Sequence, residues 1–116
     1  MWQLLQFGSV FTDFYASCSE DMQAAIDARL AYLQLKGNEA REPYSKHLEN
    51  TDGLFESRPR AGKDQARLIF FFQPGKRIVF VVAFLKKQQK LDRGLIRLAA
   101  RRKKAIETGS ENAYVT

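Results

Sequence analysis

The chain has 116 residues, of which 45% are hydrophobic and 28% charged, with a net charge of +6. This length and composition are typical of one globular domain and argue against wholesale disorder. The longest apolar run, Ile78–Leu85, is much shorter than the roughly 20 residues of a membrane-spanning helix. The first residues do not resemble a secretory signal, so we expect a cytoplasmic protein with no membrane partner.

The charges are distributed unevenly along the chain. Residues 1–52 carry four Lys/Arg and eight Asp/Glu, whereas residues 53–116 carry fifteen and five. This division indicates a basic interaction face on the C-terminal half, as in nucleic-acid-binding proteins. A solvated basic helix without a partner is the simpler alternative.

The chain has one cysteine, Cys18, and one histidine, His47. A lone cysteine cannot form an internal disulfide and fits a reducing compartment. One cysteine and one histidine cannot supply the usual ligands of a zinc site. We therefore expect no metal and no small-molecule cofactor.

The N-terminal third predicts a strand followed by helices. Trp2–Phe7 is predicted as a short strand and Phe11–Tyr15 as a helical turn. Apolar residues recurring at helical intervals predict an amphipathic helix over about 19–35. Ser17 and Glu20 have the spacing of a capping box at its start.

The middle of the chain predicts short elements between loops. Ser45–Glu49 is predicted as one helical turn that points Leu48 inward. Leu54–Arg58 is predicted as a strand, followed by a polar loop over Pro59–Asp64. One face of that strand carries Leu54, Glu56 and Arg58.

Two near-continuous apolar runs, Arg67–Phe72 and Arg77–Leu85, are predicted as strands of a hairpin. Pro74 and Gly75 supply the turn between them. Such runs are typical of strands covered on both faces, so at least one helix is expected to pack on them.

The register of this hairpin brings cations together at its open end. If Gln73 and Lys76 flank the turn, Arg67 lies opposite Val82. Lys86, four residues beyond Val82, then shares a face with Arg67. A loop of odd length would break this register.

A basic helix is predicted to follow, with Asp92 as its N-cap. Its apolar face carries Leu91, Leu95, Leu98, Ala99, Ala105 and Ile106. Its basic face carries Arg93, Arg97, Arg101 and Lys104. Like charges at this spacing are better compensated by an anionic partner. We expect a single domain over 1–108 and a flexible tail over 109–116.

A cluster of arginine and lysine without histidine still permits phosphodiester cleavage in RNA. The substrate carries its own nucleophile, the 2′-hydroxyl. The protein then has to position the phosphate and stabilise the charge of the transition state. Arginine does this with a bidentate fork and lysine with a point charge. Phosphate binding without cleavage is the simpler alternative.

Three segments resemble blocks of the HigB-like branch of the RelE/ParE toxin superfamily, which includes many phage-derived proteins. They are GLFESRP at Gly53–Pro59, ARLIFFF at Ala66–Phe72 and AFLKKQQK at Ala83–Lys90. The resemblance covers about 2–107 of the chain. It implies an α+β fold in which a small curved antiparallel sheet carries packed N-terminal helices and a C-terminal basic helix.

The resemblance also implies a function. Such proteins are toxins of type II toxin-antitoxin systems that cleave mRNA in the ribosomal A site, without metal, through attack by the 2′-hydroxyl. The implied partners are the ribosome, mRNA and a small antitoxin with a helix-turn-helix domain, as in HigA. Two alternatives stay open: a non-catalytic toxin of the ParE type that inhibits DNA gyrase, and a phage-derived protein that only binds nucleic acid.

Matching positions assign roles by resemblance. The implied catalytic residues are Arg67, Lys86, Lys87 and Arg58. The implied RNA-binding residues are Lys63, Gln89, Lys90, Arg93, Arg97 and Arg101. Many relatives carry a catalytic tyrosine or histidine near the last strand that has no counterpart here, and Tyr114 in the tail is a poor substitute. Tyr44 and His47 could reach a site across the loop, although such residues are more often structural or surface-exposed. Ser57 stands where relatives have an apolar residue.

Overall fold

The computed structural model describes residues 1–86 and 92–116. The predicted roles of Lys87, Gln89 and Lys90, and the predicted apolar contact of Leu91, lie outside the described residues. Within the described ranges the fold is α+β, as predicted, with a largely antiparallel sheet of seven strands. The strands are β1 (Gln3–Phe7), β2 (Lys46–His47), β3 (Phe55–Ser57), β4 (Arg60–Ala61), β5 (Asp64–Gln73), β6 (Arg77–Leu85) and β7 (Ala113–Val115).

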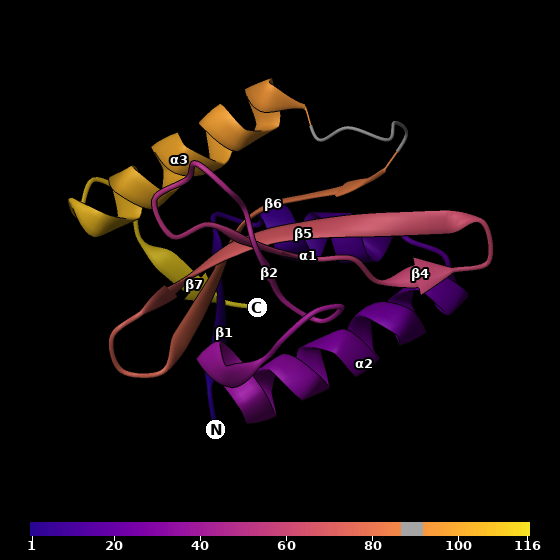
Figure 1. Ribbon diagram of the computed structural model, residues 1–116. Coiled ribbons are helices and arrows are strands. Elements are labelled where there is room, and N and C mark those ends of the chain that lie inside the picture. The colour runs from indigo at the N-terminus through magenta and orange to yellow at the C-terminus, as the bar shows by residue number, and fades with distance from the viewer. Residues whose placement is uncertain (87–91) are drawn as a thin grey trace.

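The strands follow the order β2-β3-β5-β6-β1-β7, and β4 pairs with β5 beside β3. The pair of β1 and β6 is parallel. Helices α1 (Val10–Ser17) and α2 (Glu20–Lys36) lie on one side of the sheet, and α3 (Arg93–Glu107) lies on the other (Figure 1). A 3₁₀ turn, Gly37–Glu39, ends α2.

Each face of the sheet has its own hydrophobic core, so the prediction of strands covered on both faces is confirmed. Side chains of α1 and α2 pack on alternate residues of β5 and β6, among them Phe70 and Phe80. Ala99 and Ile106 of α3 pack on the other set, which includes Phe71 and Val79. Burying both sets explains why the two strands have almost no polar residue between their ends.

The predicted long helix is confirmed as α2, but its capping residue differs. Ser19 is the N-cap, and its hydroxyl accepts a hydrogen bond from the backbone amide of Met22. The prediction of a capping box from Ser17 is wrong, because the hydroxyl of Ser17 donates to the carbonyl of Phe14 within α1. The cap of α3 is confirmed, since the Asp92 carboxylate accepts from the amide of Gly94 at 2.7 Å.

Two middle segments were predicted wrongly. Residues 45–49 contain β2 instead of a helical turn, because Lys46 and His47 pair with β3. Leu48 is nevertheless buried. The predicted loop Pro59–Asp64 contains β4, which continues the register of β3 along β5. Pro59 has no amide hydrogen to donate, so its pair with Ala66 keeps only the hydrogen bond from the Ala66 amide to the Pro59 carbonyl, at 2.9 Å.

The predicted register of the β5–β6 hairpin is wrong by two offsets. The loop has three residues, since Gln73 pairs with Arg77 and Lys76 adopts a positive φ of 57°. A β-bulge then shifts the register between Ile69 and Phe70. Arg67 consequently lies opposite Phe84 instead of Val82.

The bulge changes the side of the sheet to which the side chains at the end of β6 point. Ile69 pairs with Val82 and Phe70 pairs with Phe80, so Val81 is the additional residue. Val81 and Val82 both pack in the core beneath α3, which reverses the alternation beyond them. The two offsets therefore compensate, and alternation from Phe84 still places Lys86 on the face of Arg67.

The end of the chain forms a strand that was not predicted. Ala113–Val115 pair antiparallel with β1 as β7, at one edge of the sheet. Three residues give little periodicity, so the sequence resembles a tail. The first and last strands of the chain are thus neighbours in the sheet (Figure 1).

Candidate nucleic-acid interface

Five cations lie on the α3-facing side of the sheet, toward the open end of the β5–β6 hairpin. We call this group the cationic face; it consists of Lys46, Arg58, Arg60, Arg67 and Lys86. Their side is fixed by neighbours in the register: Leu54 packs in the core beneath α3 and Phe55 in the opposite core, so Glu56 points to the α3 side. Arg67 alternates with Ile69, which also packs beneath α3.

The register arranges these cations in rows across the strands. Lys46 pairs with Glu56, and the continuous ladder of β3 and β4 along β5 puts Arg58 opposite Arg67. One step of two residues further, about 7 Å along the strand, Arg60 pairs with Gln65. The amide of Lys86 donates to the carbonyl of Gln65 at 2.7 Å, so Lys86 completes this second row.

A buried carboxylate lies at the centre of the cationic face. Glu56 is 4% exposed, and its oxygens lie 3.7 Å from Nε of Arg58 and 3.8 Å from Nε of Arg67. The side chain of Arg67 is only 5% exposed, whereas that of Arg58 is 31% exposed. Of these two arginines, Arg67 is therefore enclosed by the fold and Arg58 faces outward.

The basic row of α3 is confirmed as a solvent-facing surface. Arg93, Arg97, Arg101 and Lys104 are all exposed. Arg93 and Arg97 line a shallow pocket with Glu49–Thr51, the loop that leads from β2 to β3. These side chains can contact a polyanion that lies across α3. Lys63 is also exposed, in the turn between β4 and β5.

Arg102 behaves differently from its basic neighbours. Its Nη1 donates to the carbonyl of Val81 at 2.6 Å, and its guanidinium lies 5.0 Å from the ring centroid of Phe7. Burial lowers the pKa of Arg102, and the charge of Arg101 lowers it further. Val81 is the bulge residue, so Arg102 provides a partner for a carbonyl at the point where the ladder is disrupted.

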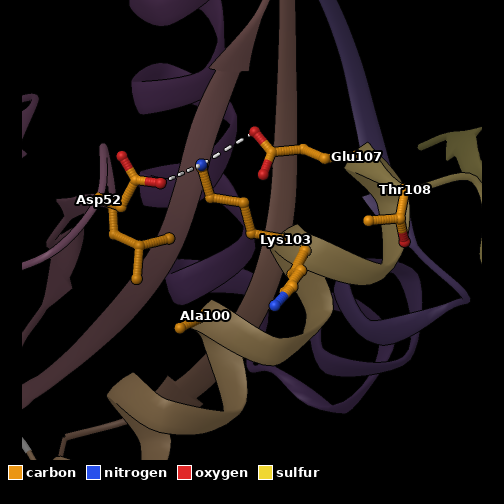
Figure 2. A pocket seen from close by; sticks show the side chains of 7 residues that line it. Asp52, Ala100, Lys103, Glu107 and Thr108 are labelled. Carbon is orange, nitrogen blue, oxygen red and sulfur yellow. Dashed lines mark hydrogen bonds and ion pairs between the residues drawn. The ribbon is translucent and has the colours of Figure 1, made fainter.

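Lys103 is a second buried cation, on the underside of α3. Figure 2 shows its ammonium group between two carboxylates, 2.9 Å from Glu107 and 3.5 Å from Asp52. It also lies 5.5 Å from the ring centroid of Phe71. Asp52, Lys103 and Glu107 line a pocket of about 460 Å³. The ion pair of Lys103 with Asp52 joins α3 to the turn before β3. We interpret Lys103 as a structural residue.

The tyrosines and the histidine considered in place of the missing residue lie away from the cationic face. His47 pairs with Phe55, and their rings are 5.1 Å apart, so His47 is on the opposite side of the sheet. Tyr44 is stacked on Tyr32 at 4.0 Å. Tyr114 pairs with Gln6 at the far edge. Among the residues that the structure describes, none of these three rings lies beside Arg67.

Sequence reasoning did not assign three members of this constellation: Glu56, Lys46 and Arg60. Glu56 was placed on the face of Arg58 by alternation, but nothing in the sequence showed that Arg67 pairs with it. The sequence after Pro59 predicts a polar loop, and for this reason Arg60 has no assigned role in it. Extending the alternation of Leu54, Glu56 and Arg58 by one step would have found it.

The cationic face can bind and neutralise a phosphate. Arginine guanidinium groups offer paired donors, and Lys86 adds a point charge. In residues 1–86 and 92–116, no group of three or more His, Cys, Asp or Glu side chains is arranged to hold a metal ion. Over the same ranges, no helix is both long and apolar enough to cross a membrane.

The fold and the site thus define a small α+β protein in which one group of cations lies on a sheet face and another along the adjacent helix. The family described as phage-derived protein Gp49-like (DUF891) matches residues 13–104. The chain belongs to this family, which is related to toxins of the RelE/ParE type. The match includes all five residues of the cationic face. No curated protein sequence matches the chain.

Proposed function

We propose that the chain is a HigB-like toxin of a type II toxin-antitoxin system that cleaves mRNA on the ribosome. The observation that carries the proposal is the cationic face, where Arg58, Arg67 and Lys86 converge on the side of the sheet that also carries basic α3. Members of the Gp49-like family are often toxin-like in such systems, which supports a cognate antitoxin as partner.

The proposed reaction uses the ribose 2′-hydroxyl as nucleophile. It loses its proton and attacks the adjacent phosphorus to form a 2′,3′-cyclic phosphate. The bond from phosphorus to the 5′-oxygen of the next nucleotide breaks, and that oxygen takes up a proton, so protons balance overall. Arg67 and Arg58 would neutralise the equatorial oxygens of the transition state, and Lys86 would stabilise the leaving oxygen. Lys87 would add a further charge at the reacting phosphate. The RNA backbone would be bound by Arg93, Arg97 and Arg101, with Lys63, Gln89 and Lys90 as further contacts.

Induction in cells tests this proposal. Primer extension on translated messages should reveal cuts at codon-defined positions with the wild type. Lys86→Ala should reduce the cuts at least tenfold, because it removes the charge that stabilises the leaving oxygen. Lys76→Ala is the matched control, since it deletes an exposed lysine at the opposite end of the same hairpin. Equal cleavage by both variants would refute the assignment of Lys86.

Gyrase inhibition is the second candidate function. It is favoured by the absence of a histidine or tyrosine beside Arg67 among the described residues, because a binding protein needs no proton acceptor. A plasmid topoisomer gel after induction distinguishes the two: lost supercoiling without mRNA cuts would replace the nuclease proposal.

A further inference from the structure

The arrangement of β3 and β5 creates an electrostatic conflict that Glu56 relieves. The common register of β3 and β4 along β5 puts Arg58 directly across from Arg67. Like charges in directly opposed positions destabilise a strand pair. Glu56, two residues before Arg58 on the same face, places one carboxylate against both guanidinium groups.

The contacts of Glu56 are made with the inner edge of each arginine. Both ion pairs join a carboxylate oxygen to Nε, at 3.7 and 3.8 Å. Neither Nε of Arg67 nor Oε2 of Glu56 has a hydrogen-bond partner, although both atoms are buried. A buried carboxylate and guanidinium that face each other without a hydrogen bond form a loose pair, which can tighten when a ligand contacts the outer Nη atoms.

We propose that Glu56 is a positioning residue, which holds Arg67 and Arg58 so that their outer nitrogens face a phosphate of the RNA. The inference rests on the proposed function for the identity of that phosphate. An ionised carboxylate only accepts hydrogen bonds, so Glu56 cannot itself bind a phosphate, whose oxygens are also acceptors. Its effect on the reaction therefore passes through the arginines.

The test compares Glu56→Gln with Glu107→Gln. Both variants remove a carboxylate that pairs with a cation, but Glu107 pairs with Lys103 away from the cationic face. In a ribosome-dependent cleavage assay at saturating ribosomes, Glu56→Gln should lower the rate constant about 10- to 100-fold, because misplaced catalytic groups cost that much. Glu107→Gln should leave the rate unchanged, and Glu56→Asp should recover part of the loss.

Coupling to Arg67 separates positioning from general structural damage. Glu56→Gln should have little further effect on the rate in an Arg67→Lys background, since the group that it positions is already altered. If the double variant instead shows the product of the two single rate reductions, the proposal is overturned. If Glu56→Gln fails to fold, Glu56→Asp replaces it in the same comparison with Arg67→Lys. Glu56→Asp keeps the charge but shortens its reach.

A measurement independent of cleavage keeps this inference distinct from the proposed function. In ¹⁵N-resolved spectra, the Nε–H signal of Arg67 should be visible in the wild type, shift on addition of a single-stranded RNA oligonucleotide, and be lost or displaced in Glu56→Gln. An unchanged Arg67 signal in that variant would overturn the positioning role. If the wild type does not cleave mRNA but these shifts occur, the nuclease proposal fails and the positioning of Arg67 for RNA stands.

Discussion

The hydrogen bond between Arg102 and the bulge in β6 leads to a prediction about stability. Arg102→Met removes the guanidinium but keeps much of the apolar stem. A hydrogen bond from a charged group contributes about 1.5–3 kcal/mol. The contact with the Phe7 ring adds about 0.5–1 kcal/mol. We therefore expect the free energy of unfolding to fall by about 2–4 kcal/mol, a large part of the 5–15 kcal/mol typical of a domain.

Urea unfolding followed by circular dichroism measures this change. Arg101→Met is the control, because it removes the same charge from the neighbouring exposed position and should change stability by less than about 0.5 kcal/mol. Equal stabilities of the two variants would refute the idea that Arg102 supports the bulge.

The same variant should disturb the end of β6. Without a partner for the Val81 carbonyl, the bulge is free to relax, and a slip by one residue would turn Lys86 to the other face. Amide signals from Val82 to Leu85 should therefore shift and exchange faster in Arg102→Met than in Arg101→Met. Unchanged signals there would show that strand pairing alone fixes the bulge.

Three further substitutions test individual contacts. Ser57→Ala should raise the free energy of unfolding by about 1 kcal/mol in urea unfolding, because the Ser57 hydroxyl is buried without a hydrogen-bond partner. Gly37→Ala should lower the melting temperature by several degrees, since Gly37 has a φ of 53° and its Cβ would meet the Trp2 indole at 1.9 Å. Asp27→Asn should lower the pKa of Tyr15 in a spectrophotometric titration, because the hydrogen bond to Asp27 raises it; an unchanged pKa would exclude this bond in solution.

The helices and the two long strands could be predicted from sequence because each buries a periodic or continuous apolar set. The basic row from Arg93 to Lys104 could be predicted because it lies opposite the apolar face of α3. The cap Asp92 could be predicted because it directly precedes that pattern. The short strands β2 and β7 could not be predicted, and β4 was missed because Pro59 separates it from β3. Two or three residues carry no period, and their strand conformation depends on a neighbour that is distant in sequence.

At the candidate site, too, strand pairing could not be predicted from the local sequence. The shared face of Arg67 and Lys86 followed from a register that was wrong at the turn and again at the bulge. The two offsets cancelled because each moves the partner of Arg67 by one residue. Neither the positive φ of Lys76 nor the extra residue Val81 has a distinctive local sequence, so the agreement did not rest on the correct geometry.

The cations differ in how firmly the fold holds them, and this difference suggests a division of labour. Arg67 is enclosed and paired with Glu56, and the face of Lys86 is set by a bulge that Arg102 contacts. Arg93 and Arg97 are exposed on α3 and carry no such restraint within the described residues. Rigid charges suit the stabilisation of a transition state, whereas exposed ones suit salt-dependent binding of a backbone. Neutralising Arg97 should therefore weaken the salt dependence of RNA binding, while Glu56→Gln should affect the rate of cleavage.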